Sequence, residues 1–134
     1  MRKKDIKGFT LAELLIVVAI IGVLVAISIP IFTGQLEKAR EATDAANIRA
    51  AYAAVSTDVL LDPRGNDTAN NITYDTDKKT YTATVTAVQT EPDWQTPSLK
   101  DGKIGGQTVA AQTKDKTWTI TGDVASGKVT IEAK

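Results

Sequence analysis

The strongest constraint in the sequence is an uninterrupted apolar stretch, LAELLIVVAIIGVLVAISI, at residues 11–29. As an α-helix, a stretch of about 19 residues is long enough to cross the ~30 Å hydrocarbon core of a membrane. A secretory signal has a shorter apolar stretch, followed by a small-x-small cleavage site. Here the apolar stretch is longer, and Pro30 and a further helical pattern follow it. We therefore predict a retained transmembrane helix over residues 11–29.

The residues before this helix predict its orientation. Residues 1–8, MRKKDIKG, contain four basic side chains against the single acid Asp5. Basic residues next to a membrane helix favour the cytoplasmic side. We expect a single-pass protein whose N-terminus lies in the cytoplasm.

Helix-forming residues continue beyond the membrane segment as far as Asp62-Pro63, where a helix stop is predicted. On a helical wheel this region carries two apolar stripes. We expect the bulky stripe to face the protein's own core, and it comprises Ile48, Tyr52, Val55 and Val59. The slim stripe on the opposite side is dominated by alanine and comprises Phe32, Leu36, Ala39, Thr43, Ala46, Ala50, Ala53 and Leu61.

The slim stripe has two interpretations. Short side chains let helices approach closely, which predicts contact with other molecules; alternatively, they only raise helix propensity. A continuous helix from Thr10 to Leu61 would be roughly 78 Å long, more than a small domain can cover, and this favours contact with other molecules. A third set of residues, Glu37, Glu41 and Asp44, lies in line with the bulky stripe but upstream of it. We expect that face to be solvated up to about residue 45, where the bulky stripe begins.

Beyond Pro63, turn-forming residues give way to segments rich in Thr and Val. TYTATVTAV (80–88), KTWTIT (116–121) and KVTIEA (128–133) alternate with period two, which is typical of strands. The residues expected to point inward are Tyr81, Ala83, Val85, Ala87, Trp118, Ile120, Val129 and Ile131. A short strand is expected around 72–74, whereas Pro and Gly residues favour loop in 89–115. We predict an α+β fold in which one long N-terminal helix packs on an antiparallel sheet of three or four strands.

The composition excludes several classes of function. The chain carries 16 basic and 16 acidic residues, and this balance does not favour a nucleic-acid partner. Cys and His are absent, which removes disulfides, thiolate metal sites and the commonest general base. We therefore expect no enzymatic activity, no cofactor and no metal site. Loop oxygens of Asp62, Asn66 and Asp67 are conceivable calcium ligands, but a solvated loop is the favoured interpretation.

The two tryptophans receive different predictions. Trp118 lies in an alternating segment and is assigned to the core. Trp94, in the segment EPDWQTP, is expected at the surface, with a role in adhesion or in packing against another subunit.

The N-terminal motif GFTLAE, with a basic leader before it and an apolar run after it, resembles the N-terminus of type IV prepilins. The resemblance covers residues 1 to about 30. It implies that a prepilin peptidase cleaves between Gly8 and Phe9 and that the new amine of Phe9 is N-methylated. It further implies a leader at residues 1–8, a long helix at 9–61 and a globular β domain at 62–134. A glycine before the cleavage site suits a protease that needs an extended backbone.

Glu13 is an ionisable residue near the start of an otherwise apolar segment, where a lone carboxylate costs about 2.5–3.5 kcal/mol on insertion scales. The resemblance implies that it pairs with the N-terminal amine of Phe9 on a neighbouring subunit. The alternative is a carboxylate that reaches the membrane interface and stabilises the helix N-terminus through its dipole.

Three further residues are assigned to assembly. Gly22 and Ala26 have the small-xxx-small spacing of close helix contacts in lipid. Pro30 removes a backbone donor and should kink or loosen the helix, and the resemblance implies that the helix melts near it in a filament.

The resemblance implies a structural subunit of a type IV pilus, and the alanine-rich slim stripe and Glu13 favour a major over a minor subunit. The filament could serve adhesion, motility, DNA uptake or secretion, and the sequence does not choose among them. The subunit's implied partners are other copies of the same chain, the prepilin peptidase, an assembly platform protein and an ATPase. It would reside in the cytoplasmic membrane before assembly and in an extracellular pilus afterwards. Two alternatives are a pseudopilin of type II secretion or competence, and a membrane-tethered binding domain that keeps its leader. Many pilins close a C-terminal loop with a disulfide, which this cysteine-free chain does not have.

Overall fold

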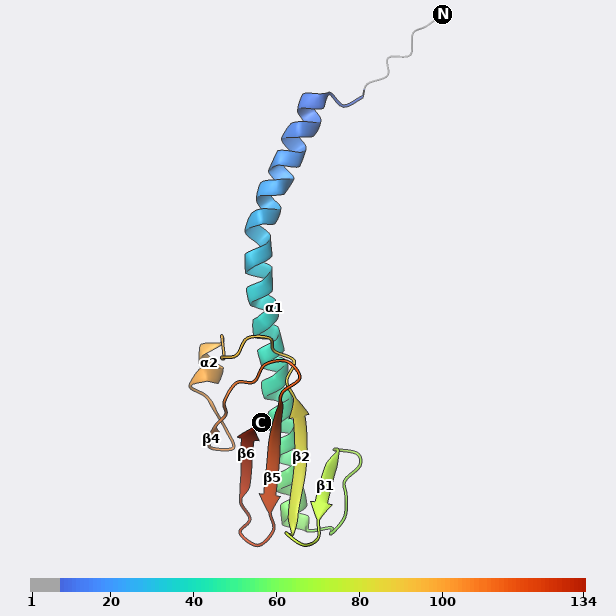
Figure 1. Cartoon of the computed structure of the whole chain (residues 1–134), viewed down its shortest axis with the longest axis vertical. Coiled ribbons are helices and arrows are strands. Elements are labelled where there is room, and N and C mark those ends of the chain that lie inside the picture. Colours follow the sequence, from blue (N-terminus) through green and yellow to red (C-terminus); the bar gives the residue numbers. More distant parts are fainter. Residues whose placement is uncertain (1–7) are drawn as a thin grey trace, which may run out of the picture. The chain divides into compact units, whose positions relative to one another are not determined.

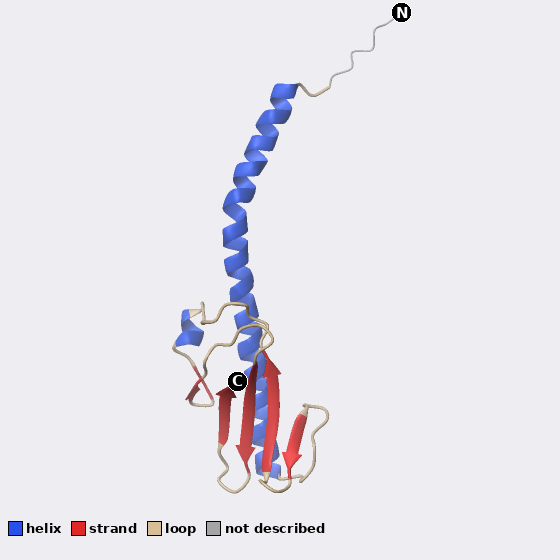
Figure 2. Cartoon of the chain, viewed as in Figure 1, coloured by secondary structure: helices blue, strands red, loops and turns tan. Residues whose placement is uncertain are grey.

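The computed structural model describes residues 8–134, so most of the expected leader lies outside the described residues. It divides into two compact units, Met1–Gln35 and Leu36–Lys134, and the boundary falls within helix α1 (Leu11–Leu61). The second unit contains the C-terminal part of α1 and all the strands (Figures 1 and 2). The structure confirms the predicted α+β class, with a long helix and a small antiparallel sheet.

Helix α1 is unbroken through Pro30. On either side of this residue, hydroxyl groups donate to helix carbonyls: Ser28 Oγ to Leu24 O at 2.7 Å and Thr33 Oγ1 to Pro30 O at 3.0 Å. The helix ends where predicted, because Asp62 adopts a left-handed backbone conformation (φ 43°) and Pro63 follows. The melting expected near Pro30 concerns the filament and stays a prediction.

The main sheet has the strand order β1-β2-β5-β6, with every neighbouring pair antiparallel. Its strands are β1 (Ile72–Asp75), β2 (Thr80–Thr86), β5 (Thr117–Asp123) and β6 (Val129–Ala133), close to the predicted segments. Threonines pair across the strands on the face away from the helix, for example Thr82 with Thr121 and Thr84 with Thr119. Such cross-strand pairs stabilise a solvated sheet face.

The core forms where the bulky stripe of α1 meets the inward face of this sheet. Ile48 and Val55 from the helix are fully buried, as are Tyr81 from β2 and Trp118 and Ile120 from β5. The predicted division of the strands into inward and outward faces is therefore confirmed. Two of the residues expected in the core, Tyr52 and Ile131, are only partly buried, and both pack against the buried cluster.

Gly122 on β5 allows the helix to approach the sheet closely. An added Cβ at this position would lie 2.4 Å from Val59 Cγ2 and 2.7 Å from Val55 Cγ1. Both distances are far below van der Waals contact, so any side chain here would push α1 away from the sheet.

The β2–β5 connection, residues 87–116, contains short elements that the sequence did not predict. They are α2 (Pro97–Lys100) and a hairpin of β3 (Lys103–Ile104) and β4 (Gln107–Thr108). The hairpin turn, Gly105-Gly106, has positive φ at both residues, and an added Cβ at Gly105 would overlap the ring of Tyr52. Propensity and periodicity do not identify two-residue strands, because such strands exist only through their tertiary contacts.

Side-chain amides cover both edges of the main sheet. Asn66 Oδ1 accepts the Tyr74 N–H of β1 at 2.8 Å. On β6, Gln107 Oε1 accepts the Ile131 N–H at 3.0 Å while its Nε2 donates to the Val129 carbonyl at 2.5 Å. Blocked edges prevent the sheet from pairing with strands of other chains.

We expect Gly122→Ala to lower the free energy of unfolding by about 1–3 kcal/mol, because the new methyl group overpacks the helix–sheet contact. Thermal or denaturant unfolding of the detergent-solubilised chain measures this. Gly65→Ala is the matched control, since nothing lies within 4 Å of its added Cβ. Equal stability of the two variants would contradict the close-packing argument.

Candidate assembly site

The expected cleavage site lies in exposed, non-helical backbone. Gly8, Phe9 and Thr10 precede the first residue of α1, and the side chain of Phe9 is 89% exposed. The Gly8–Phe9 peptide therefore lies outside helical hydrogen bonding, as a protease that binds an extended backbone requires. Cleavage at this peptide stays a prediction.

Thr10 and Glu13 form a reciprocal capping box at the start of α1. The Thr10 N–H donates to Glu13 Oε2 at 2.9 Å, and the Glu13 N–H donates to Thr10 Oγ1 at 3.2 Å. Each side chain thus satisfies a backbone donor that the first helical turn leaves without a partner. Within a single chain the carboxylate stabilises the helix N-terminus, as in the alternative interpretation of Glu13, and it does so through a specific hydrogen bond. The T-x-x-E spacing at residues 10–13 signals such a box, although the roles predicted for Glu13 did not include it.

The helix surface in the first unit is exposed and apolar. Its exposed large apolar residues are Leu11, Leu14, Leu15, Ile16, Val17, Val18, Ile20, Ile21, Val23, Leu24, Val25, Ile27, Ile29, Ile31 and Phe32. The helix is long and apolar enough to span a membrane. At Gly22, an added Cβ would meet nothing within 4 Å in this chain, and Ala26 is also exposed. In water such a surface would be very unfavourable, so lipid or other helices must cover it.

The slim stripe is also exposed in the described structure. Its members Leu36, Ala39, Ala46, Ala50 and Ala53 lie on the surface, whereas Ile48, Val55 and Val59 of the bulky stripe are buried. The two faces of α1 are therefore distinct: the chain covers one with its own sheet and leaves the other open. The packing role of the open face remains a proposal.

The prediction that Glu37, Glu41 and Asp44 face solvent is wrong. All three are buried, and we call them the acidic clamp, because they hold the backbone of the β2–β5 connection. Asp44 accepts the Val88 and Gln89 N–H groups at 2.9 Å. Glu41 accepts the N–H groups of Gln95 and Thr96, the latter at 2.8 Å.

Glu37 completes the acidic clamp at its upstream end. Its Oε1 accepts the Thr90 and Glu91 N–H groups at 2.6 and 2.8 Å, and its Oε2 accepts the Thr90 hydroxyl at 2.6 Å. Arg40 contributes an ion pair at 3.4 Å. Charge alone predicts solvation, but here backbone N–H groups replace water around the carboxylates. The sequence signal that could have predicted their burial is their alignment with the bulky stripe of α1.

These contacts affect the ionisation of Glu37. Burial raises its pKa, but the backbone N–H of Glu91, the hydroxyl and N–H of Thr90 and the Arg40 guanidinium outweigh burial. The net pKa of Glu37 therefore lies below its ordinary value, because every one of these donors favours the charged form.

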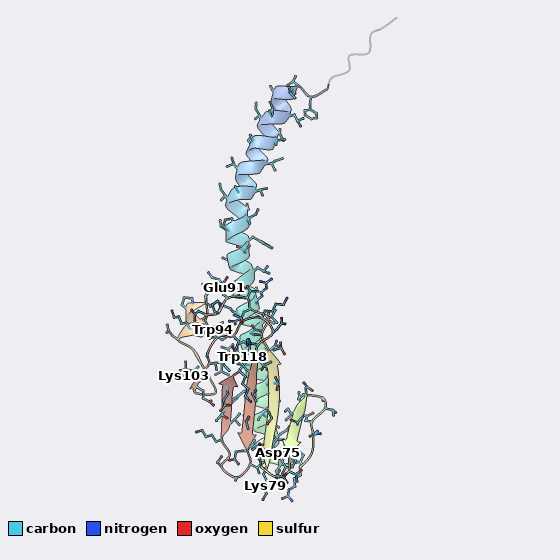
Figure 3. All side chains as sticks on the ribbon, viewed as in Figure 1. Asp75, Lys79, Glu91, Trp94, Lys103 and Trp118 are labelled. Atoms are coloured by element: carbon cyan, nitrogen blue, oxygen red, sulfur yellow. The ribbon has the colours of Figure 1, made fainter. Side chains whose placement is uncertain are left out.

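The prediction that Trp94 lies at the surface is also wrong. Its indole is buried and stacks on Trp118, with ring centroids 6.0 Å apart. Figure 3 marks both tryptophans in the β domain. The two indole N–H groups donate to consecutive carbonyls of the β2–β5 connection: Trp94 Nε1 to Val109 O at 2.8 Å and Trp118 Nε1 to Ala110 O at 2.7 Å. Trp94 therefore holds this connection in place, and an adhesive role for its ring is excluded.

The loop oxygens weighed as calcium ligands are engaged within the protein. Asp62 Oδ1 accepts the Tyr81 hydroxyl at 3.1 Å, Asn66 accepts the Tyr74 N–H, and Asp67 accepts the Ala69 and Asn70 N–H groups. Within residues 8–134, no group of three or more acidic side chains is arranged to hold a metal ion.

The sequence of this chain is similar to those of known proteins. Residues 3–29 match the family model described as the prokaryotic N-terminal methylation motif. The type IV narrow pilus major component PilA5 of Thermus thermophilus is 37% identical over 86 residues, covering 55% of this chain and 74% of that protein. The type IV major pilin PilA of Myxococcus xanthus is 41% identical over 68 residues, covering 51% of this chain and 31% of PilA. No solved structure matches significantly.

The fold and the N-terminal segment define a small β domain on a helix that is long and apolar enough to span a membrane. With the relatives above, they show that this chain belongs to the type IV pilin family. Members of this family are structural subunits and not enzymes.

We expect Asp44→Ala to lower the free energy of unfolding by about 2–4 kcal/mol, because it leaves the Val88 and Gln89 N–H groups buried without an acceptor. Denaturant unfolding measures the loss. Asn47→Ala is the matched control, since this polar side chain lies one turn further along the same helix and is exposed. An equal loss in both variants would show that the acidic clamp is not responsible.

We expect acid to loosen the β2–β5 connection locally. Because the native pKa of Glu37 is lowered, its stabilising effect is complete above the ordinary pKa of 4.5 and is lost as the pH falls through the lowered value. Hydrogen exchange of the Thr90 and Glu91 amides, corrected for intrinsic rates, should accelerate over that window. In Glu37→Gln, which has no charge to titrate, this pH dependence should disappear.

Proposed function

We propose that the chain is the major subunit of a type IV pilus and polymerises through α1. The observation that carries this proposal is the exposed apolar surface of α1 with a single carboxylate at its start. Two surroundings match such a surface: a lipid bilayer before assembly, and a bundle of identical helices afterwards. Both relatives are named as major pilus components, which favours a pilus over a secretion or competence pseudopilin.

In this proposal, a prepilin peptidase cleaves between Gly8 and Phe9, and the amine of Phe9 is N-methylated. The basic leader holds the N-terminus in the cytoplasm until cleavage. Its removal leaves one amine as the only N-terminal charge. The exposed, non-helical backbone at these two residues supports access by the peptidase.

Glu13 selects the position at which a subunit joins the filament. A carboxylate among apolar side chains is costly unless a positive charge meets it. The amine of Phe9 on a neighbouring subunit supplies that charge, and pairing neutralises both groups within the helix bundle. A helix that docks one turn out of register leaves both charges without a partner, so the pair defines the axial register.

The remaining assembly contacts follow the open face of α1. Gly22 and Ala26 permit close helix contact in the apolar segment, and Pro30 supplies a point where the helix can loosen. Further along, the contacts are made by Phe32, Leu36, Ala39, Ala46, Ala50 and Ala53. Because each subunit must leave the membrane to join the fibre, we include an assembly platform protein and an ATPase among the partners. The mature pilus is extracellular.

Mass spectrometry of the mature protein should identify N-methylated Phe9 as its first residue. An intact Met1 would contradict the pilin function and would favour a membrane-tethered binding domain, which keeps its leader.

We expect Glu13→Ala to reduce filament yield at least ten-fold, because the Phe9 amine then enters the bundle without a partner at a cost of about 2.5–3.5 kcal/mol. The measurement is the sheared surface fraction relative to total subunit. Asp77→Ala, which removes an exposed turn carboxylate, is the control. Normal yield and symmetry in Glu13→Ala would refute the assembly mechanism.

A further inference from the structure

A pocket of about 400 Å³ lies in the β domain, at the end of the main sheet where α1 stops. Three segments meet there: the residues that follow α1, the β1–β2 turn and the β5–β6 turn (Figure 1). We call it the tip pocket, and its lining includes Asp62, Arg64, Tyr74, Thr76, Lys79 and Val124. Its volume falls within the range of sites that bind small organic molecules.

Three residues that line the tip pocket have a left-handed backbone. The φ angles of Asp62, Arg64 and Lys79 are 43°, 54° and 54°. Among the other non-glycine residues of 8–134, only Asn71 and Asp115 share this conformation. Glycine adopts it freely, whereas a residue with a Cβ is strained in it. Two long basic side chains therefore stand where the backbone favours glycine, and such strain is concentrated at functional sites.

A buried tyrosine fixes the position of Arg64. The Arg64 N–H donates to Tyr81 Oη at 2.9 Å, and this hydroxyl donates to Asp62 Oδ1 at 3.1 Å. Arg64 Nε in turn donates to Asp62 Oδ2 at 3.3 Å, and Tyr81 is fully buried. Within residues 8–134, neither terminal nitrogen of the Arg64 guanidinium has an acceptor. Both are available for the bidentate contact that a guanidinium makes with a carboxylate.

Lys79 supplies a second cation to the tip pocket. In the described part of the chain no carboxylate pairs with its ammonium group, whereas the neighbouring Lys78 pairs with Asp75 at 3.9 Å. The Lys79 carbonyl accepts the Val124 N–H at 3.2 Å, which ties the β1–β2 turn to the β5–β6 turn. Figure 3 marks Lys79 at this end of the β domain. The pocket thus presents two basic side chains against one acid, which favours an anionic ligand.

The other walls of the tip pocket favour a ligand that is larger than a bare anion. Tyr74 is half-buried and packs against Tyr81, with ring centroids 4.7 Å apart. Its ring and the side chain of Val124 are apolar surfaces, on which the face of a ring can lie. The exposed Thr76 hydroxyl can exchange hydrogen bonds with a polar substituent. These walls suit a ring that carries both a carboxylate and hydroxyl groups.

We propose that the tip pocket binds a uronic acid, a sugar unit that carries a carboxylate. Arg64 and Lys79 bind the carboxylate. Tyr74 contacts the face of the sugar ring, and Thr76 bonds to one of its hydroxyls. This inference goes beyond the proposed function and does not depend on filament formation, because one β domain supplies every residue of the site.

Titration of the full chain in detergent micelles with sodium glucuronate tests the ligand class. Binding is followed by the NMR shifts of the Arg64, Thr76 and Lys79 amides. Glucose, which has no carboxylate, and acetate, which has no ring, are titrated at the same ionic strength. We expect glucuronate to bind at least about ten-fold more tightly than either, because only glucuronate engages both the cations and the aromatic wall.

The left-handed positions allow substitutions that remove a cation and relieve strain together. We expect Lys79→Gly and Arg64→Gly each to weaken glucuronate binding by about five-fold or more. Their thermal midpoints should equal or exceed that of the parent chain, since glycine suits this backbone. Weaker binding in a chain of undiminished stability cannot result from unfolding. Lys78→Gly is the matched control, because it removes the same charge from the same turn outside the pocket lining, and it should bind within about two-fold of the parent.

Four results would overturn the inference. The first two are unchanged amide shifts with glucuronate, and an equal response to glucose or acetate. The third is an equal loss of binding in Lys78→Gly and Lys79→Gly, which would assign the effect to net charge. The fourth is a lower thermal midpoint in Lys79→Gly, which would show that the backbone does not favour glycine there.

Discussion

The contact between the bulky stripe of α1 and the inward face of the sheet is the interaction on which the rest of the structure depends. Ile48 and Val55 are fully buried against Trp118 and Ile120, and Gly122 lets the helix backbone come close. Because this contact uses one face of the helix, the opposite face stays open. The same packing that stabilises the β domain therefore leaves a surface for other subunits, and folding and assembly do not compete for the same residues.

The β2–β5 connection contains little regular structure and is held in place without a disulfide. Side chains from elsewhere in the fold bind its backbone: the acidic clamp from α1 at one end, and the indoles of Trp94 and Trp118 further along. A disulfide stabilises mainly by restricting the unfolded chain. Here the stabilisation comes from satisfying buried donors, so it depends on the charge state of the carboxylates. Protonation of Glu37 should therefore loosen the connection where this carboxylate accepts the Thr90 and Glu91 N–H groups.

At the other end of α1, one carboxylate has two successive tasks. In the single chain, Glu13 caps the first helical turn through Thr10. In the proposed filament, it neutralises an amine from another subunit. Among residues 8–134 the box engages only Oε2 of Glu13, so a subunit need not break its own contacts to gain new ones. A capped carboxylate also avoids the full cost of an unsatisfied charge in lipid.

Local pattern in the sequence determined the class of fold, the bounds of α1, the four main strands, the separation of two helix faces and the pilin family. Each of these leaves a periodic signal or a motif in contiguous residues. The acidic clamp and the burial of Trp94 were decided by tertiary structure alone. Glu37, Glu41 and Asp44 look solvated when only their charge is considered, and Trp94 lies in a Pro-flanked segment with no period. The partners of the acidic clamp are backbone groups some fifty residues away. Every residue except proline has the same backbone N–H group, so no sequence pattern marks which ones will face a carboxylate, and only the folded chain brings them together.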